Sequence, residues 1–227
     1  MQQEEKLTAH QVIRNFISKY AKPAGFFFIA ILIVFVIIQI VGVANDKKNV
    51  KATLAIEDIQ SRYVQTLQEN ENATFDTVQP YIEELNGVIV KYPKLYAGRR
   101  ALFLKGDIYY RFDKFQEAAG VFSDFAGKFQ DSYLAPICIA NTGACYEKMG
   151  KPAEAEAEYL KIYNSYRGEY ALMPKVIFAL GRLNETNGKY ADAEKYYQMI
   201  TDDYSDSNFS LYAQDRIILM KAKGLLN

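Results

Sequence analysis

The chain of 227 residues has almost no histidine: the one imidazole is that of His10, close to the N-terminus. The rest of the chain therefore lacks the base of a Ser-His-Asp triad or a Cys-His pair, and it lacks histidine metal ligands. Neither GxxxxGK[ST] nor GxGxxG occurs, so no phosphate-binding or dinucleotide-binding loop is predicted. The sequence predicts a protein that is not an enzyme and that needs no cofactor or metal.

Cysteine is also scarce, with only Cys138 and Cys145. On one helix this spacing places the two residues about 10.5 Å apart along the axis, beyond the roughly 7 Å that a disulfide allows between Cα atoms. The spacing is also wrong for a CxxC redox or zinc pair. We expect two buried, apolar thiols.

No excess of charge of either sign is present, because 27 basic residues stand against 27 acidic ones. Residues 23–227 alone carry 23 basic and 25 acidic residues, a net charge of −2. That part has no electrostatic footprint for nucleic acid.

What the sequence does contain is a run of nineteen residues without a charge, from Phe26 to Ala44. As a helix the run covers about 28 Å, close to the hydrocarbon thickness of a bilayer. A single transmembrane helix over residues 23–45 is therefore predicted, with the lipid bilayer as its partner. A cleaved signal peptide is the alternative, with Gly42 and Ala44 at the cleavage site, but its apolar stretch would be only about 7–15 residues.

The tail of residues 1–22 is predicted to form an amphipathic helix that Thr8 caps and that ends near Pro23 and Gly25. Its apolar face consists of Val12, Ile13, Phe16, Ile17 and Tyr20, opposite Arg14 and Lys19. Four Lys or Arg residues precede the predicted span and four follow it closely. The positive-inside rule therefore leaves the orientation open.

A repeat of 37 or 38 residues fills the rest of the chain, which has 18 Tyr and 14 Phe but no Trp. Each unit has a Gly, then an Ala twelve residues later, then an aromatic residue four further on, and it closes on another aromatic residue, Phe129, Tyr166 or Tyr204. The packing residues predicted from this pattern are Gly106, Ala118, Phe122, Gly143, Ala155, Tyr159, Gly181, Ala193 and Tyr197. Such a period indicates stacked supersecondary units.

Each unit is predicted to be two antiparallel helices, which the Gly and the Ala allow to approach closely. Gly150 and Gly188 stand where the first helix of a unit would end in the left-handed conformation, and Pro152 can start a second helix.

This pattern resembles the tetratricopeptide repeat (TPR), with Gly, Tyr, Ala and Phe at these offsets. The units here are three or four residues longer, and Asn184 replaces the usual Tyr in the third. The resemblance implies an all-α fold, a TPR-like solenoid after the span. Its parts are a degenerate first unit (46–97), three units (98–208) and a C-terminal capping helix (209–227) with Leu211, Ala213, Ile217, Ile218 and Leu219 facing the last unit.

The layout as a whole resembles a narrower family, the ancillary subunit of the bacterial SecYEG translocon. That resemblance implies a single-pass inner-membrane protein with a cytoplasmic N-terminus and periplasmic repeats. Translocon subunits and periplasmic chaperones are the partners it implies.

TPR proteins line their concave face with the first helix of each unit, which implies a groove for a protein or peptide. The residues that the family's offsets assign to it are Arg100, Phe103, Asp107, Tyr110, Arg111, Asn141, Ala144, Lys148, Lys175, Phe178, Arg182 and Glu185. Aromatic rings would anchor the peptide and guanidinium groups would bind its carboxylates.

Three functions remain open from the sequence. The first is a membrane-tethered adaptor or scaffold that holds client proteins near the translocon or envelope machinery. The second is a structural subunit of a larger envelope assembly, flagellar or in outer-membrane biogenesis. The third is a cytosol-facing targeting receptor.

Overall fold

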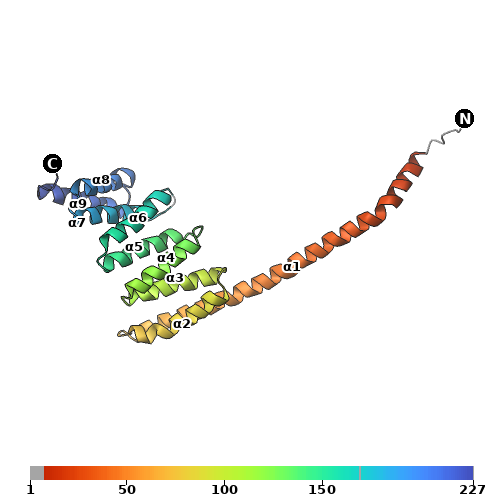
Figure 1. Ribbon diagram of the computed structural model, residues 1–227, viewed down its shortest axis with the longest axis horizontal. Helices are drawn as coiled ribbons and strands as arrows, with labels where there is room; N and C mark the ends of the chain where they lie inside the picture. Colours follow the sequence, from red (N-terminus) through yellow and green to blue (C-terminus); the bar gives the residue numbers. More distant parts are fainter. Residues whose placement is uncertain (1–7, 169, 227) are drawn as a thin grey trace. The chain divides into compact units, whose positions relative to one another are not determined.

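The computed structural model describes residues 8–168 and 170–226, and Figure 1 shows them as helices joined by short turns. The side chains of residues 9, 11, 12, 15, 21–25 and 28–30 lie outside this description. The chain divides into two compact units, one up to Lys51 and one from Ala52 onward.

Helix α1 (Ala9–Glu69) begins directly after Thr8 and runs without interruption for 61 residues. The prediction that Pro23 and Gly25 end a separate tail helix is therefore wrong. A proline removes one backbone hydrogen bond, and the bonds on either side keep the helix continuous. In the tail, Ile13, Phe16, Ile17 and Tyr20 are exposed, and the side chain of Val12 lies outside the described residues.

Within the described residues, no helix has both the length and the apolar character required to cross a membrane. The predicted span includes residues 28–30, whose side chains are among those not described.

From Ala52 onward the described chain is all-helical, which confirms the predicted α-solenoid of TPR type. The end of α1 pairs with α2, and three further pairs and a last helix follow in chain order (Figure 1). The bounds are α2 (Phe75–Lys91), α3 (Tyr96–Arg111), α4 (Phe115–Lys128), α5 (Ala135–Lys148), α6 (Pro152–Ser165), α7 (Met173–Thr186), α8 (Tyr190–Asp203) and α9 (Asn208–Ala222).

The nine residues assigned to repeat packing are all buried. In each full unit the glycine of the first helix faces the aromatic ring of the second. A Cβ atom built on Gly106 would lie 2.7 Å from the Phe122 ring, and one built on Gly181 would lie 2.6 Å from the Tyr197 ring. A Cβ atom built on Gly143 would lie 3.0 Å from the Tyr159 ring. Glycine is needed because the ring occupies the space of a side chain.

The predicted left-handed turns are confirmed at Gly150 (φ 69°) and Gly188 (φ 73°). Asp113 occupies the same place in the preceding unit with φ 57°. A carboxylate side chain tolerates this region better than most L-residues do. The three turns therefore have one geometry although their sequences differ.

Gly150→Ala and Gly188→Ala are each expected to lower the free energy of unfolding by about 1 kcal/mol, because an L-residue is strained at this φ. A Cβ at either position meets no atom within 4 Å, so backbone strain is the only cost. Urea unfolding of the purified chain followed by circular dichroism measures the loss. An unchanged midpoint for both variants would contradict the assigned turn geometry.

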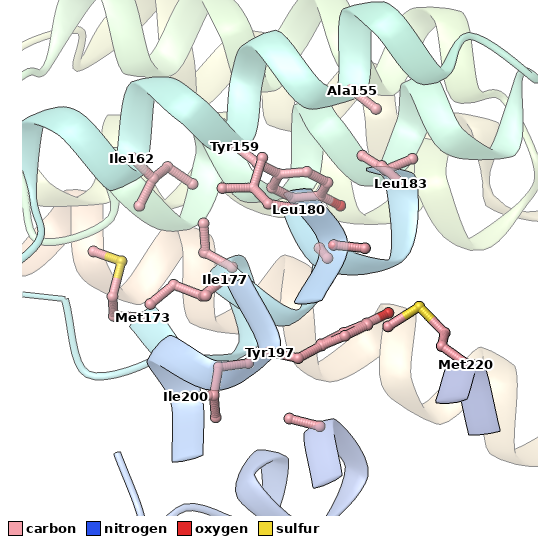
Figure 2. Close-up of a cluster of buried hydrophobic side chains, with 14 residues drawn as sticks. Ala155, Tyr159, Ile162, Met173, Ile177, Leu180, Leu183, Tyr197, Ile200 and Met220 are labelled. Carbon is pink, nitrogen blue, oxygen red and sulfur yellow. The ribbon is translucent and has the colours of Figure 1, made fainter. Parts of the chain in front are cut away.

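The core of the last two units is formed by buried side chains from four helices (Figure 2). Tyr159 and Ile162 come from α6, Ile177 and Leu180 from α7, and Tyr197 from α8. Because α7 contributes to the packing on both sides, neighbouring units bury one another's apolar stripes.

Asn184 lies 3% exposed in this region, where the repeat pattern has a tyrosine. Its amide donates to Glu156 at 2.9 Å and to the carbonyl of Leu180 at 2.9 Å. The first of these bonds joins α7 to α6. Asparagine can therefore replace the usual tyrosine here, because its hydrogen bonds take the place of the packing of a ring.

Cys138 and Cys145 are buried and unbonded, as the sequence predicts. Burial raises the pKa of each thiol to about 12. Both are therefore packing residues rather than reactive thiols.

The predicted capping face of the last helix is partly wrong. Ala213 is buried and Ile217 packs against the core, but Leu211 and Ile218 are 66% and 64% exposed and Leu219 is also exposed. The inward face is completed by Ser210 and Met220. Apolar residues occur all around α9, so its sequence does not specify which face is covered.

Candidate protein-binding groove

A hollow of about 340 Å³ lies on the side of the repeat formed by the first helix of each unit. We call it the α5 hollow, because α5 lies between the helices that supply its walls. It is lined by Tyr110, Ala144, Glu147, Lys148, Tyr159, Lys175, Phe178, Ala179, Arg182 and Phe209.

The aromatic walls of the α5 hollow are held by ring contacts. The Phe178 ring centroid lies 5.4 Å from that of Tyr197 and 5.6 Å from that of Phe209. On the opposite wall, the Tyr110 ring meets Phe115 edge-on at 5.4 Å. Apart from the fully buried Tyr197, these rings are half-buried, so they present apolar surface while being fixed in position.

The rim carries both paired and unpaired cations. Arg182 is ion-paired with Glu147 across the α5–α7 interface. Lys148 and Lys175 are exposed, and neither has an ion pair with any described residue. The α5 hollow thus combines apolar walls with two cations that have no counter-ion in the described part of the chain.

Glu147 belongs to an inter-unit network, in which it accepts a hydrogen bond from the Tyr159 hydroxyl at 2.7 Å as well as from Arg182. Burial, and then the bond to Glu147, raise the pKa of Tyr159. The network neutralises the only carboxylate of the α5 hollow.

The same network recurs one unit later. Glu185 accepts from the Tyr197 hydroxyl at 2.9 Å and from Arg216 at 2.9 Å, with a second ion pair to the Arg216 guanidinium. Burial is again the first cause of the raised pKa of Tyr197. Arg182 and Glu185 were assigned to ligand binding from the sequence, and in the structure both are ion-paired within the protein.

The structure brings six of the predicted groove residues together in the α5 hollow: Tyr110, Ala144, Lys148, Lys175, Phe178 and Arg182. Asn141 lies half-buried one turn before Ala144 on α5, outside the lining. Glu185 is placed in the network of the following unit.

The remaining four predicted groove residues lie nearer the first unit. Arg100 binds the Gln60 amide oxygen at 2.7 Å and lies 3.8 Å from Glu57. The Phe103 ring packs edge-on against the buried Phe122 at 5.8 Å. Asp107 and Arg111 are exposed, and partial desolvation raises the pKa of the Asp107 carboxyl while Arg111 opposes that shift.

Sequence reasoning missed four lining residues, Glu147, Tyr159, Ala179 and Phe209. A signal for one of them was present: Glu147 and Glu185 each precede a tyrosine by twelve residues. In the preceding unit, Phe122 takes the place of the tyrosine, and Tyr110 takes the place of the glutamate twelve residues before it. The carboxylate thus occurs where a hydroxyl needs an acceptor.

A larger hollow of about 570 Å³ lies between α4, α5 and α6. Its lining is mainly small or polar, with Ser123, Ala126 and Gln130 among the residues, and its one cation, Lys161, is paired with Glu158 at 2.7 Å. Because its charges are satisfied and it has no opposed aromatic walls, the α5 hollow is the better candidate despite its smaller volume.

Comparison with known proteins agrees with this architecture. A family model described as "Tetratricopeptide repeat" matches residues 175–207. A "TPR repeat-containing protein" of Treponema pallidum (strain Nichols) is 22% identical over 118 residues, which are 52% of this chain and 48% of that protein. The chain thus spans about half the length of this curated relative.

Two solved structures are similar in fold. A tetratricopeptide repeat protein from Parabacteroides merdae ATCC 43184 superposes with a TM-score of 0.56 at 17% identity, over 75% of this chain and 61% of that one. A Podosopora anserina putative kinesin light chain with TPR-like repeats gives 0.54 at 15% identity, over 74% and 88%. The chain therefore contains a tetratricopeptide repeat at residues 175–207, and its fold is that of the tetratricopeptide repeat proteins.

Proposed function

We propose that this chain is a membrane-tethered adaptor that holds a segment of a partner protein in the α5 hollow and catalyses no reaction itself. The observation that carries the proposal is the α5 hollow, where fixed aromatic rings lie beside Lys148 and Lys175, two cations for which the described residues supply no counter-ion. Interfaces draw much of their affinity from a few buried aromatic anchors, and exposed charges beside them favour a partner of complementary charge. Tetratricopeptide repeat proteins generally bind protein partners, and stacked helical repeats offer extended surfaces for doing so.

Support for the tether comes from the uncharged run Phe26–Ala44. Within it, the large apolar side chains from Ile31 to Val43 are 49–63% exposed. An exposed apolar stretch of this size on a helix is unfavourable in water and favourable in lipid. A tether would raise the effective concentration of the α5 hollow for partners at the same membrane.

The cellular setting of the proposal rests on the resemblance to the ancillary translocon subunit. We place the chain in a bacterial inner membrane, with its N-terminus in the cytoplasm and its repeats in the periplasm. Exported chains, translocon subunits and periplasmic chaperones are then the candidate partners.

Membrane attachment is tested by carbonate extraction of cell membranes, and orientation by protease treatment of spheroplasts. The tethered form is expected to stay in the carbonate-resistant pellet, and the repeats to be digested only from the periplasmic side. Release of the full chain into the supernatant would contradict the tether. Protection of the repeats would contradict the orientation.

The binding role is tested by filling the α5 hollow. Ala144→Phe places a ring on its floor, and Ala126→Phe is the matched control, since it places the same ring in the larger hollow. Cells that produce the full tagged chain are cross-linked with formaldehyde, and the adducts are quantified by mass spectrometry. The yield of the adducts that the wild-type chain forms is expected to be at least tenfold lower for A144F and unchanged for A126F. Equal adducts in A144F, with unchanged circular dichroism, would contradict the role of this surface.

A further inference from the structure

We infer that the α5 hollow selects an extended partner segment in which one large apolar side chain lies between two carboxylates. This inference rests on the proposed binding role and adds the chemistry of the partner. It follows from the shape of the α5 hollow, the positions of its two unpaired lysines and the neutralisation of its one carboxylate.

One small side chain of α5, Ala144, leaves space between the larger side chains of the α5 hollow. Ala144 lines the floor, whereas Tyr110 from α3 and Phe178 from α7 form facing walls. A volume of about 340 Å³ lies at the small end of ligand pockets and suits one large side chain with part of its backbone. Aromatic walls around a small-residue floor favour a ring or a leucine as the anchor.

The unpaired charge at the α5 hollow is positive, although the chain as a whole has no net charge. Each oxygen of Glu147 already accepts a hydrogen bond, one from the Tyr159 hydroxyl and one from Arg182, and the guanidinium balances its charge. Lys148 and Lys175 keep their full donor capacity. A partner that supplies carboxylates is therefore favoured, and one that supplies Lys or Arg is disfavoured.

The two lysines line the α5 hollow at different levels along the helix axes. Helices α5 and α7 run in the same direction, because each packs against α6 and is joined to it by a short connection that reverses the chain. Gly143 and Gly181 mark equivalent levels, with Lys148 five residues after the first and Lys175 six residues before the second. An offset of eleven helical residues is about 16 Å along the axes.

This separation sets the spacing of the partner's carboxylates. An extended chain advances about 3.3 Å per residue, so carboxylates four residues apart span roughly 13 Å and point to the same side as the residue midway between them, and the flexible lysine side chains can reach inward to meet them. The apolar anchor then falls midway, above Ala144. One carboxylate at a chain end would meet only one of the two lysines. We therefore assign the site to an internal segment with two acidic side chains.

A defined peptide tests the assignment. The probe is fluorescein-labelled Glu-Ser-Phe-Ser-Glu with a blocked C-terminus, titrated with the full chain in detergent micelles while fluorescence anisotropy is read. Replacing both Glu by Gln, or Phe by Ala, is expected to weaken binding at least tenfold. A probe with one internal Glu, or with only a free terminal carboxylate, is expected to bind about threefold to tenfold more weakly than the original.

Charge reversal on the protein provides the complementary arm. The double variant Lys148→Glu with Lys175→Glu is expected to lose at least tenfold in affinity for the probe and to bind the version with Lys in place of both Glu. Lys94→Glu, an exposed lysine between α2 and α3, is the matched control and should leave the affinity unchanged. Equal affinity for the Glu and Gln probes, no binding at millimolar protein, or no effect of the double reversal would each overturn the assignment.

The two levels of the proposal fail differently. If A144F abolishes the cellular adducts but the probes are not discriminated, the partner chemistry is wrong and the binding role stands. If A144F leaves the adducts unchanged, the binding role itself fails, whatever the peptides show.

Discussion

Replacing Gly98 by alanine is expected to lower the free energy of unfolding of the repeats by about 3 kcal/mol, at the upper end of overpacking effects. A Cβ atom at this position would lie 2.0 Å from the carbonyl oxygen of Tyr92 and 2.9 Å from its carbonyl carbon. Both are backbone atoms, so no side-chain rotation can relieve the contact. The start of α3 would have to move away from the end of α2.

Urea unfolding of the full chain, followed by circular dichroism, measures this loss. Gly181→Ala should be the next most damaging change, and Gly143→Ala milder, because their contacts are with rings at 2.6 and 3.0 Å. Gly127→Ala is the control: it is an exposed position in α4 with no atom within 4 Å of the added Cβ. It should stabilise the chain by about 0.5–1 kcal/mol through helix propensity. A Gly98→Ala variant as stable as the wild type would refute the close approach at Tyr92.

Glu185→Ala is expected to cost about 2 kcal/mol, because it leaves the hydroxyl of the fully buried Tyr197 without its acceptor and Arg216 without its counter-ion. The partial exposure of Arg216 keeps the cost below that of a fully buried ion pair. Since Glu185 connects α7 to α9, the loss should appear first as faster amide hydrogen exchange in α9.

A double-mutant cycle separates the network from its parts. Tyr197→Phe removes only the hydroxyl, and Phe122 already occupies the equivalent place in an earlier unit. We expect it to cost 1 kcal/mol or less. In the double variant the two losses should fail to add by about 0.5–1 kcal/mol, because the hydroxyl and its acceptor form one interaction. Strict additivity would mean that Tyr197 and Glu185 act independently.

The repeat was predictable from the sequence because its spacing is fixed by contact geometry. A ring such as Tyr197 can lie over a helix only where a glycine such as Gly181 stands opposite, so the two residue types recur in register. The left-handed turns at Gly150 and Gly188 were predictable for the same reason, since few residues adopt that conformation.

The end of the solenoid was less predictable. In the middle of the array, both neighbours of a helix are specified by the repeat, so its apolar faces can be assigned. Only one face of helix α9 is covered, but apolar residues occur on both its covered face and its exposed face. Its periodicity alone could not show that Leu211 and Ile218 lie outward while Ala213 and Met220 lie inward.

The candidate site was predicted in part. Residues such as Tyr110, Lys148 and Phe178 were assigned to one groove because each stands at an offset by which the first helices of TPR proteins line their concave face, and all three line the α5 hollow. The roles of Arg182 and Glu185 were not predicted correctly. A charged residue on a helix face has the same sequence signature whether it meets a ligand or a neighbouring unit. Only the three-dimensional contacts with Glu147 and Arg216 distinguish these alternatives.

The most direct test of the central claim, that the α5 hollow is where partners bind, is site-specific photo-crosslinking in living cells. A photoreactive amino acid is placed at Asn141, beside the floor of the α5 hollow, or at Gln198, an exposed position on the second helix of its unit. Discrete protein adducts are expected from position 141 and not from position 198, and Ala144→Phe should remove them. Adducts of equal yield from both positions, or none from position 141, would contradict the claim.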